Sequence, residues 1–194
     1  MAVMLRRLKI QDCEGMFEWM HDMEIAQCFR DNMSVKDWND VLEFVKNSDN
    51  VVTDGASAHF AIVEDTDEYL GTISLKNINL KDKNAEYAIS LRRTAWGRGI
   101  GQAATMEVLR LAFMEHGLER IYLNVLENNI KAIHLYEKCG FVLEGKFRHH
   151  LYKNGVYNDL RWYAMLRDDY VKNLGGGGKL LSCFSIIIYK FKNA

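Results

Sequence analysis

LRRTAWGRGIGQAA, residues 91–104, is the most informative stretch of this chain. A strand is expected to end at Leu91, glycines follow at positions 97, 99 and 101, and an amphipathic helix then runs to about His116. Glycine tolerates positive φ and has no side chain that could block a ligand, so backbone N–H groups in this turn can converge on one anion. The helix N-terminus adds about half a positive charge, and Arg98 adds a full charge near the rim. The stretch therefore predicts a cradle for a diphosphate.

The glycine spacing excludes two common phosphate-binding motifs. A P-loop requires GxxxxGK[ST], and no Lys-Ser or Lys-Thr follows the glycines here. A Rossmann fingerprint requires GxGxxG in a parallel βαβ unit, whereas Gly97, Gly99 and Gly101 lack the final spacing and the preceding strands look antiparallel. Taken alone, the segment is also explained by a helix start whose glycines serve tight packing.

A second motif lies in residues 126–141, LENNIKAIHLYEKCGF. It matches the pattern N-x-x-A-x-x-L-Y-E-K-x-G-F at Asn129, Ala132, Leu135, Tyr136, Glu137, Lys138, Gly140 and Phe141. Gly99 and Gly101 match an earlier pattern, Q/R-x-x-G-x-G/A, with Trp96 where Gln or Arg is commonest. With both motifs in this order, the chain resembles the GNAT superfamily of acyl-CoA-dependent N-acyltransferases over roughly residues 4–168. The Trp-Gly-Arg-Gly run is similar to the branch that contains ribosomal-protein N-terminal, amino-sugar and polyamine acetyltransferases.

The hydrophobic periods around these motifs predict a mixed α/β domain. Expected strands cover 4–10, 59–63, 68–77, 86–92 and 121–126, and a hairpin pairs 141–152 with 156–166 around Lys153-Asn154-Gly155. Expected helices begin at Asp12 and at Ser34, where Ser34-Val-Lys-Asp37 is similar to a capping box, and a short helix covers 129–138. The resemblance implies a GNAT-like, mostly antiparallel central sheet, flanked by helices, with a splay between its fourth and fifth strands.

The domain is expected to be complete near Tyr170, so residues 1–170 are assigned to one N-acetyltransferase-like domain. Four consecutive glycines, Gly175–Gly178, are typical of a flexible linker. The apolar stretch 180–191 (LLSCFSIIIYKF) follows and is too short to span a bilayer. Residues 171–194 are therefore assigned to a linker and an apolar tail whose role the sequence leaves open.

Composition and charge exclude several classes of protein. With 25 Lys and Arg against 26 Asp and Glu, the net charge is −1, so no overall basic field recruits nucleic acid or acidic lipid. The four cysteines are widely spaced and form no CxxC pair, and no metal-ligand spacing occurs, which argues against a zinc ribbon, a disulfide scaffold and a bound metal. No stretch reaches about 18 apolar residues, and the charged N-terminus lacks a signal-peptide core. We expect a cytoplasmic protein.

The resemblance also implies acetyl-CoA as the cosubstrate and assigns its parts to this chain. The pantetheine arm is expected beside the backbone of Ala88, Ile89, Ser90 and Leu91. The diphosphate is expected on the backbone amides of Arg98, Gly99, Ile100, Gly101, Gln102 and Ala103. Asn129 is expected to bond the amide or phosphate region of the coenzyme, and Tyr136 to lie near the thioester sulfur.

Transfer of acetyl to an amine requires a neutral amine, a hydrogen-bond donor for the oxyanion and a proton for the departing thiolate. A backbone N–H around Ser90 or Leu91 is the expected oxyanion donor. Tyr136 is the candidate general acid, because a phenol with a pKa of about 10 stays protonated at neutral pH. Without the motif, an amphipathic tyrosine of the core explains Tyr136 as well.

The general base is less well defined. Some relatives place a glutamate five residues before the motif asparagine, and here that position is Asn124, which cannot act as a base. Glu86 on the fourth strand is the next candidate, through a water molecule, with a solvated strand carboxylate as the alternative. Asp159, His149 and His150 on the terminal hairpin could touch the acceptor, and Asp159 suits an ammonium group, although exposed hairpin positions explain all three better.

Four further side chains have both a functional and a structural explanation. Cys139 could be an acyl-cysteine nucleophile, but a small buried hydrophobic residue explains it better. No His/Asp/Cys arrangement supports covalent catalysis. Trp19, Phe29 and Trp38 could line an acceptor pocket, and core packing explains them equally well.

Together these features predict an acetyl-CoA-dependent N-acetyltransferase in which a primary amine attacks the thioester directly. The acceptor is a small molecule or a peptide. An amino sugar, nucleotide-linked or not, and a protein N-terminus stay open, while the near-neutral net charge argues against a strongly cationic polyamine. A homodimer is compatible with the sequence. The alternative is a non-catalytic acyl-CoA-binding sensor or interaction module, which would bind the coenzyme without turnover.

Overall fold

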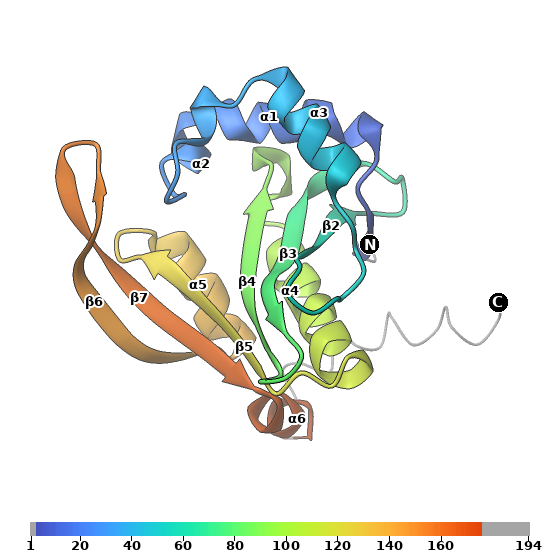
Figure 1. The fold of residues 1–194 in the computed structure, drawn as a ribbon, viewed down its shortest axis with the longest axis vertical. Helices are drawn as coiled ribbons and strands as arrows, with labels where there is room; N and C mark the ends of the chain where they lie inside the picture. The colour runs from blue at the N-terminus through green and yellow to red at the C-terminus, as the bar shows by residue number, and fades with distance from the viewer. Residues whose placement is uncertain (1–2, 176–194) are drawn as a thin grey trace.

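A computed structural model describes residues 3–175 of the chain. The described sheet has seven strands in the order β1-β2-β3-β4-β5-β7-β6 (Figure 1). The strands are β1 (Met4–Arg7), β2 (Ala58–Val63), β3 (Tyr69–Asn79), β4 (Asn84–Leu91), β5 (Arg120–Leu126), β6 (Val142–Lys153) and β7 (Val156–Leu166). Neighbouring strands pair antiparallel except β4 and β5, which are parallel. The predicted GNAT-like mixed α/β fold is confirmed.

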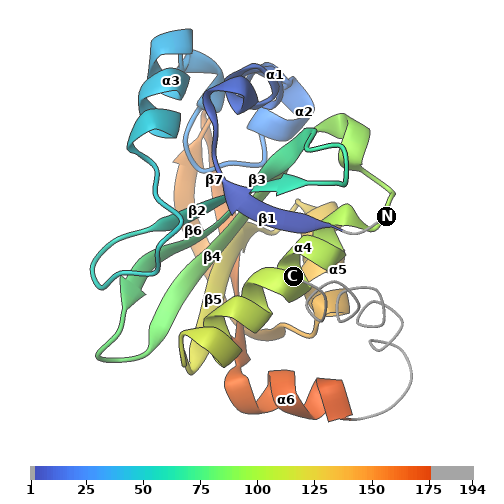
Figure 2. The ribbon, with the colours of Figure 1, turned by 90° about the vertical axis from the view of Figure 1, so that its right-hand side faces the viewer.

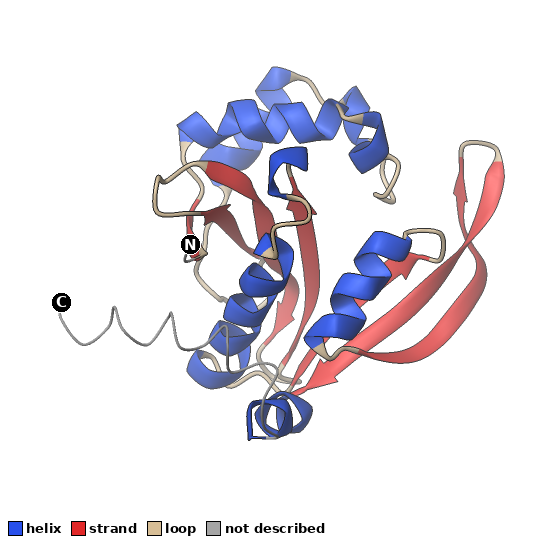
Figure 3. Cartoon of the chain, turned by 180° about the vertical axis from the view of Figure 1, so that it is seen from behind, coloured by secondary structure: helices blue, strands red, loops and turns tan. Residues whose placement is uncertain are grey.

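Helices flank the sheet on one face and at both ends of its strands. They are α1 (Cys13–His21), α2 (Met23–Ala26), α3 (Trp38–Asn47), α4 (Ile100–Arg110), α5 (Ile130–Cys139) and α6 (Arg167–Gly175). Helices α1 to α3 lie beyond one end of the strands and α6 beyond the other (Figure 1). Helices α4 and α5 lie on the same face of the sheet (Figures 2 and 3). Within residues 3–175, no helix combines the length and the apolar character that crossing a membrane requires.

The parallel pair β4–β5 opens along its length. Pairing is confined to Asn84–Glu86 against Arg120–Tyr122, although β4 runs on to Leu91 and β5 to Leu126. Figure 1 shows the two strands meeting at one end and diverging toward α1 and α2. Beyond the opening, β4 stays paired with β3, and β5 is paired with β7 over its full length. The predicted splay between the fourth and fifth strands is therefore confirmed.

Two hydrophobic clusters hold the helices on the sheet. The larger cluster includes Tyr87 of β4 and Tyr136 of α5 and lies between the sheet and helices α4 and α5. The smaller cluster lies under α1 and α3 and includes Trp19, whose indole N–H donates to the hydroxyl of Tyr69 at 3.0 Å. Full burial of such a large apolar side chain stabilises the fold by about 1.5–3 kcal/mol. The larger cluster thus fixes α4 and α5 on one face of the sheet, and the smaller cluster fixes α1 and α3 near the open end of the β4–β5 pair.

Helix α6 extends the fold past the terminal hairpin. Tyr170 of α6 is fully buried and its ring lies 5.3 Å from that of Phe113. This helix was not among the elements expected from the sequence. Asp168 and Asp169 in its first turn stabilise the helix start. The boundary predicted at residue 170 falls inside α6, and most of the predicted linker and the stretch 180–191 lie outside the described residues. The division into domain and tail stays a prediction.

Helix α3 begins later than the sequence predicted. The expected start was Ser34, whereas α3 starts at Trp38 behind Asp37. The Asp37 carboxylate accepts a hydrogen bond from the Asp40 N–H at 2.9 Å, and the Asp40 carboxylate accepts one from the Asp37 N–H at 3.0 Å. These two reciprocal bonds satisfy two donors at the helix start, whereas Ser34 lies in a separate 3₁₀ turn, Met33–Val35, where its N–H donates to Oδ1 of Asn32 at 3.2 Å. The capping box is therefore present but shifted along the chain.

Candidate active site

The turn before α4 has the geometry of an anion cradle. Gly97 and Gly99 adopt φ values of 70° and 79°, and a Cβ on either would meet nothing within 4 Å. Gly99 is the N-cap residue of α4, and within the described residues no side chain caps this helix start. The first N–H groups of a helix lack intrahelical partners and carry the positive end of its dipole. Open space, uncapped amides and this dipole fit the diphosphate of a coenzyme.

The predicted diphosphate amides lie in this turn, with one exception. Arg98, Gly99, Ile100, Gly101 and Gln102 form the turn and the first residues of α4. The amide of Ala103, however, donates to the Gly99 carbonyl at 3.1 Å. That bond is part of the helix itself, so the predicted cradle is one residue too long at its C-terminal end.

The side chain of Arg98 turns away from the predicted rim position. Its Nη2 donates to Oε2 of Glu64 at 2.6 Å, and its Nη1 donates to the carbonyl of Thr94 at 3.1 Å. The full positive charge of Arg98 expected near the rim is therefore paired with Glu64. Glu64 lies 34 residues before Arg98 in the chain and belongs to no motif, so only the fold reveals the contact.

The edge of β4 that borders the opening is formed by the backbone of Ile89 and Leu91. The N–H of Arg92 donates to the Leu70 carbonyl of β3 at 2.9 Å. Because backbone N–H groups point to alternate sides along a strand, those of Leu91 and Ile89 point away from β3 and toward β5. These two predicted residues can therefore bond a pantetheine arm, or an oxyanion, through their main chain.

Ala88 and Ser90 were predicted for the same role, but their main-chain groups face β3. A Cβ on Gly71 of β3 would lie only 2.2 Å from the Ser90 carbonyl oxygen, which places that oxygen on the β3 side. Ser90 is paired with Thr72, and Ala88 with Ser74, in the β3–β4 register. The alternation of the strand thus corrects the prediction, and Leu91 rather than Ser90 is the candidate oxyanion donor.

Tyr136 of α5 lies in an aromatic cluster on the helix face of the opening. Its ring makes edge contacts with Tyr87 and Phe141, with centroids 5.8 and 6.0 Å apart. Burial, with smaller contributions from Cys139 and Cys28, raises the pKa of the Tyr136 phenol above its usual value. A raised pKa means that the phenol keeps its proton at neutral pH. Tyr136 therefore has the protonation state that a proton donor to a thiolate requires.

Glu86 points to the opposite face of the sheet from Tyr136. Its neighbour Tyr87 packs against Tyr136, and adjacent side chains of a strand point to opposite faces. The Glu86 carboxylate accepts hydrogen bonds from Lys76 Nζ at 3.2 Å and Asn77 Nδ2 at 2.8 Å. Glu86 is also the last residue of β4 paired with β5. The candidate acid and the candidate base thus lie on two sides of the opening, with the base at its closed end.

An aromatic group that sequence analysis did not single out lies beside Glu86. Tyr122 is the partner of Glu86 across the strands, and its ring stacks on Trp162 with centroids 6.1 Å apart. The ring of Phe147 lies 5.3 Å from that of Trp162. In the described part of the chain, the buried indole N–H of Trp162 has no hydrogen-bond partner. This face of the opening therefore has aromatic surface beside the Glu86 carboxylate.

The two asparagines of the motif region have defined structural positions. Oδ1 of Asn129 accepts a hydrogen bond from the Ala132 N–H at 3.2 Å and caps α5. That leaves the side-chain amide group of Asn129 as the part that can meet a coenzyme. Asn124 is paired with Trp162 in the β5–β7 register and carries no carboxylate, so the fifth strand supplies no base at this position.

The hairpin residues are held by the hairpin itself. Asp159 lies 2.8 Å from Lys146 Nζ and accepts a hydrogen bond from the His149 N–H at 2.8 Å. The contact with Lys146 has the largest effect, and together these contacts lower the pKa of Asp159 to about 2. His149 and His150 are exposed. His149 and His150 thus occupy the exposed hairpin positions expected of them, whereas Asp159 is ion-paired and only 22% of its side chain is exposed.

The remaining candidates belong to the core or the surface. Cys139 is 1% exposed, as expected of a small buried hydrophobic residue. Trp19 stacks on Phe29 with centroids 5.3 Å apart within the smaller cluster, and Trp38 is 45% exposed on α3. Among residues 3–175, no group of three or more His, Cys, Asp or Glu side chains is arranged to hold a metal ion.

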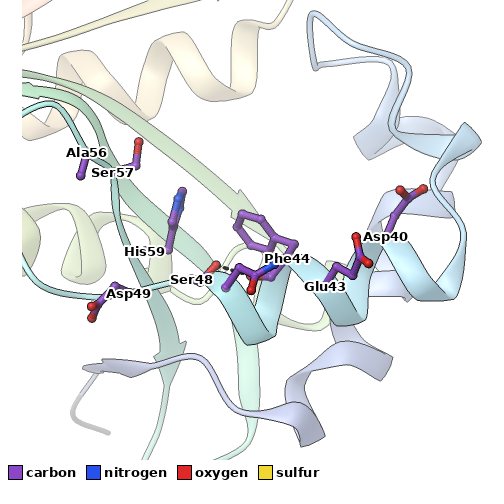
Figure 4. Close-up of a pocket in the computed structure, with 9 residues that line it drawn as sticks. Asp40, Glu43, Phe44, Ser48, Asp49, Ala56, Ser57 and His59 are labelled. Carbon is purple, nitrogen blue, oxygen red and sulfur yellow. Dashed lines mark hydrogen bonds between the residues drawn. The ribbon is translucent and has the colours of Figure 1, made fainter.

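A separate hollow of about 500 Å³ lies between α3 and the start of β2 (Figure 4). Its lining consists of Asp40, Glu43, Phe44, Asn47, Ser48, Asp49, Ala56, Ser57 and His59. Burial and the nearby Lys76 lower the pKa of His59. The hollow is therefore mainly acidic, and it draws its lining from other elements than the opening between β4 and β5.

Comparison with known proteins identifies the relatives of this chain. Residues 2–142 match the model of the acetyltransferase (GNAT) domain family. The spermidine N(1)-acetyltransferase of Vibrio cholerae is 32% identical over 120 residues, which are 62% of this chain and 69% of that protein. YdaF of Bacillus subtilis, whose name proposes a ribosomal N-acetyltransferase activity, is 34% identical over 100 residues, or 52% of this chain and 55% of that protein.

Solved structures give the same result for the fold. The crystal structure of the Vibrio cholerae spermidine N-acetyltransferase in complex with CoA and spermine superposes with a TM-score of 0.77 and 26% sequence identity. The match covers 87% of this chain and 98% of the other. The open strand pair and the glycine turn of this chain thus belong to a fold that is shared along nearly the whole length of a CoA-bound enzyme.

Proposed function

This chain belongs to the GNAT acetyltransferase family, and we propose that it acetylates a polyamine that reaches the thioester at the opening between β4 and β5. It is an acetyl-CoA-dependent N-acetyltransferase, as its family and its relatives are. The observation that carries the proposal is the arrangement of the opening: an anion cradle beside it, a protonated phenol on one face and a carboxylate with aromatic surface on the other.

On the coenzyme side, backbone groups do most of the binding. The amides from Arg98 to Gln102 hold the diphosphate, aided by the dipole of α4. The N–H and carbonyl groups of Ile89 and Leu91 bond the pantetheine arm as an added strand would, because they point into the opening. The side-chain amide of Asn129 meets the arm from the start of α5.

The chemical step needs three groups of this chain. A neutral amine attacks the thioester carbonyl, and the N–H of Leu91 donates to the oxygen on which negative charge develops. Glu86 accepts the proton of the amine through a water molecule. This water lies on the face of the opening that carries Glu86 and the Tyr122–Trp162 stack, which we call the acceptor face. Tyr136 gives its phenolic proton to the sulfur as the carbon–sulfur bond breaks, so the thiol leaves neutral. Acid and base therefore act from opposite faces of the sheet.

A polyamine suits the acceptor face better than the amino sugar or protein N-terminus expected from the sequence. The net charge of −1 is a sum over the whole chain and does not describe the site. Locally, Glu86 lies beside the Tyr122–Trp162 stack. A carboxylate attracts an ammonium group, and aromatic faces bind cations by about 0.5–2 kcal/mol. The acceptor ammonium would compete here with Lys76 for Glu86 and with Arg120 for the Tyr122 ring. Spermidine is named as the substrate of one relative, and spermine is bound in the solved structure of a spermidine N-acetyltransferase.

A thiol-release assay with acetyl-CoA tests this proposal. We expect kcat/KM for spermidine and spermine to exceed that for an amino sugar and for a peptide N-terminus by at least tenfold, or about 1.4 kcal/mol. A reaction without amine controls for thioester hydrolysis. A preference for the sugar or the peptide would contradict the acceptor assignment. Coenzyme binding without thiol release from any of these amines would favour the sensor instead.

The homodimer and the cytoplasmic location inferred from the sequence stay predictions. The described surface does carry exposed large apolar side chains on the terminal hairpin, among them Phe147, Tyr152 and Tyr157. Size-exclusion chromatography with light scattering measures the oligomeric state directly.

A further inference from the structure

Glu64, at the end of β2, is a buried carboxylate that touches the diphosphate turn. Only 8% of the residue is exposed. Its Oε2 accepts a hydrogen bond from Arg98 Nη2 at 2.6 Å, while within the described residues its buried Oε1 has no hydrogen-bond partner. Arg98 is therefore the main group that compensates the buried negative charge of Glu64.

This dependence ties the Arg98 side chain to β2. If Arg98 turned outward to meet a phosphate, a nearly buried carboxylate would lose its counter-charge, and breaking a buried ion pair from one side is strongly destabilising. The Arg98 guanidinium also donates to the Thr94 carbonyl, within the same turn. The side chain thus bonds at once to β2 and to the backbone that leads into the cradle.

The backbone on both sides of Arg98 has few intrinsic restraints on its conformation. Gly97 and Gly99 both have positive φ, a region that glycine enters as readily as its alternatives. Nothing in these two residues holds the turn in the cradle conformation. The hydrogen bonds of the Arg98 side chain to Glu64 and Thr94 supply that restraint from outside.

We propose that Glu64 is a positioning residue for coenzyme binding, which holds Arg98 and so fixes the turn with its amides directed at the diphosphate. In this arrangement the diphosphate is bound by backbone amides and the α4 dipole, and the Arg98 charge is balanced by Glu64. The inference rests on the proposed coenzyme site and adds the residue that organises it.

A role for Arg98 as a direct phosphate ligand predicts the opposite change in CoA affinity when the Glu64 charge is removed. If Arg98 were a phosphate ligand, Glu64 would compete with the coenzyme for its charge, and removing the Glu64 charge would tighten binding. If Glu64 positions Arg98, removing its charge loosens the turn and weakens binding. The nearly isosteric substitution Glu64→Gln therefore separates the two.

The experiment is calorimetric titration of CoA into the full chain and into Glu64→Gln, Arg98→Gln and the double variant, at low and moderate salt. We expect each single substitution to raise Kd by about tenfold, and the double variant to resemble the singles because both changes break one interaction. We expect the salt dependence of Kd to stay as in the parent chain, since no side-chain charge on the ligand is lost. With saturating acetyl-CoA, kcat should stay within about twofold while KM for acetyl-CoA rises.

Glu68→Gln is the matched control. Glu68 pairs with Arg92 at 3.3 Å near the same end of the sheet but is exposed, and its loss should leave Kd unchanged. Tighter or unchanged binding by Glu64→Gln, or a flatter salt dependence in Arg98→Gln, would overturn the proposal. If Glu64→Gln does not fold, the Arg98→Gln variant tests the proposal alone, through the salt dependence of its Kd for CoA, because Arg98 is more exposed than Glu64. If the parent chain takes up no CoA, the proposed function itself fails, which is a distinct result.

Discussion

Replacing Tyr136 with phenylalanine is expected to lower kcat by about 100-fold, while KM for acetyl-CoA changes by less than about twofold. The phenylalanine ring keeps the edge contacts with Tyr87 and Phe141, so the packing of α5 on the sheet is preserved. What is lost is the proton that the departing thiolate would receive. Steady-state kinetics with the best amine of the acceptor panel measures both constants.

Tyr87→Phe is the control for this substitution. Tyr87 loses a hydroxyl in the same buried cluster, one that shares a hydrogen bond with Thr105 at 2.7 Å. Its removal should cost about 1 kcal/mol of stability and leave kcat within about threefold of the parent value. An unchanged kcat in Tyr136→Phe would contradict the acid role, and an equal loss in Tyr87→Phe would assign the effect to packing.

The pH dependence of kcat in the parent enzyme also tests whether Tyr136 is the general acid. Burial raises the pKa of Tyr136, so its protonated form persists as pH rises past the range in which an exposed tyrosine ionises. The activity of the parent chain should therefore not fall between neutral pH and about pH 10 through loss of this proton. A fall of kcat with an apparent pKa well below 10 that disappears in Tyr136→Phe would contradict this.

Replacing Gly99 with alanine is expected to raise the Kd for CoA by at least about tenfold, equivalent to about 1.4 kcal/mol. A Cβ at this position meets no protein atom within 4 Å and enters the space assigned to the diphosphate. The substitution also forces alanine to a φ of 79°, which should cost about 1 kcal/mol of stability. Calorimetric titration and thermal unfolding measure the two effects separately.

Gly55→Ala is matched to it in geometry. Gly55 has a φ of 71°, and a methyl group added there would have equally open space around it, but the residue lies in the turn before β2, outside the opening. The substitution should cost a similar amount of stability with no change in Kd. Equal binding by Gly99→Ala and Gly55→Ala would mean that the diphosphate does not approach the turn at Gly99.

The fold could be predicted from the sequence because two local motifs fall at its two decisive points. The glycines of 97–101 mark the start of α4, and the segment 126–141 contains the end of β5 and all of α5. The splay between β4 and β5 follows once the family is recognised. Boundaries were less accurate. Capping by Asp37 rather than Ser34 depends on which of two side chains completes a reciprocal pair, and burial of Tyr170 in α6 depends on Phe113, far away in the chain.

The main-chain part of the proposed site follows from the sequence motifs, whereas side-chain contacts across the fold do not. The cradle amides and Tyr136 follow from motifs. That Ser90 faces β3 while Leu91 faces the opening is a matter of strand parity, which only the pairing with β3 defines. Glu64 and Trp162 belong to no motif. Glu64 becomes relevant through its contact with Arg98, and Trp162 through its stacking on Tyr122 beside Glu86.

The decisive experiment is a crystal structure of this chain with CoA. We expect diphosphate oxygens within hydrogen-bond distance of amides between Arg98 and Gln102, and a pantetheine arm lying between β4 and β5 along the Ile89–Leu91 edge. A coenzyme bound elsewhere with the glycine turn empty, or no uptake at millimolar concentration, would contradict the proposed coenzyme site.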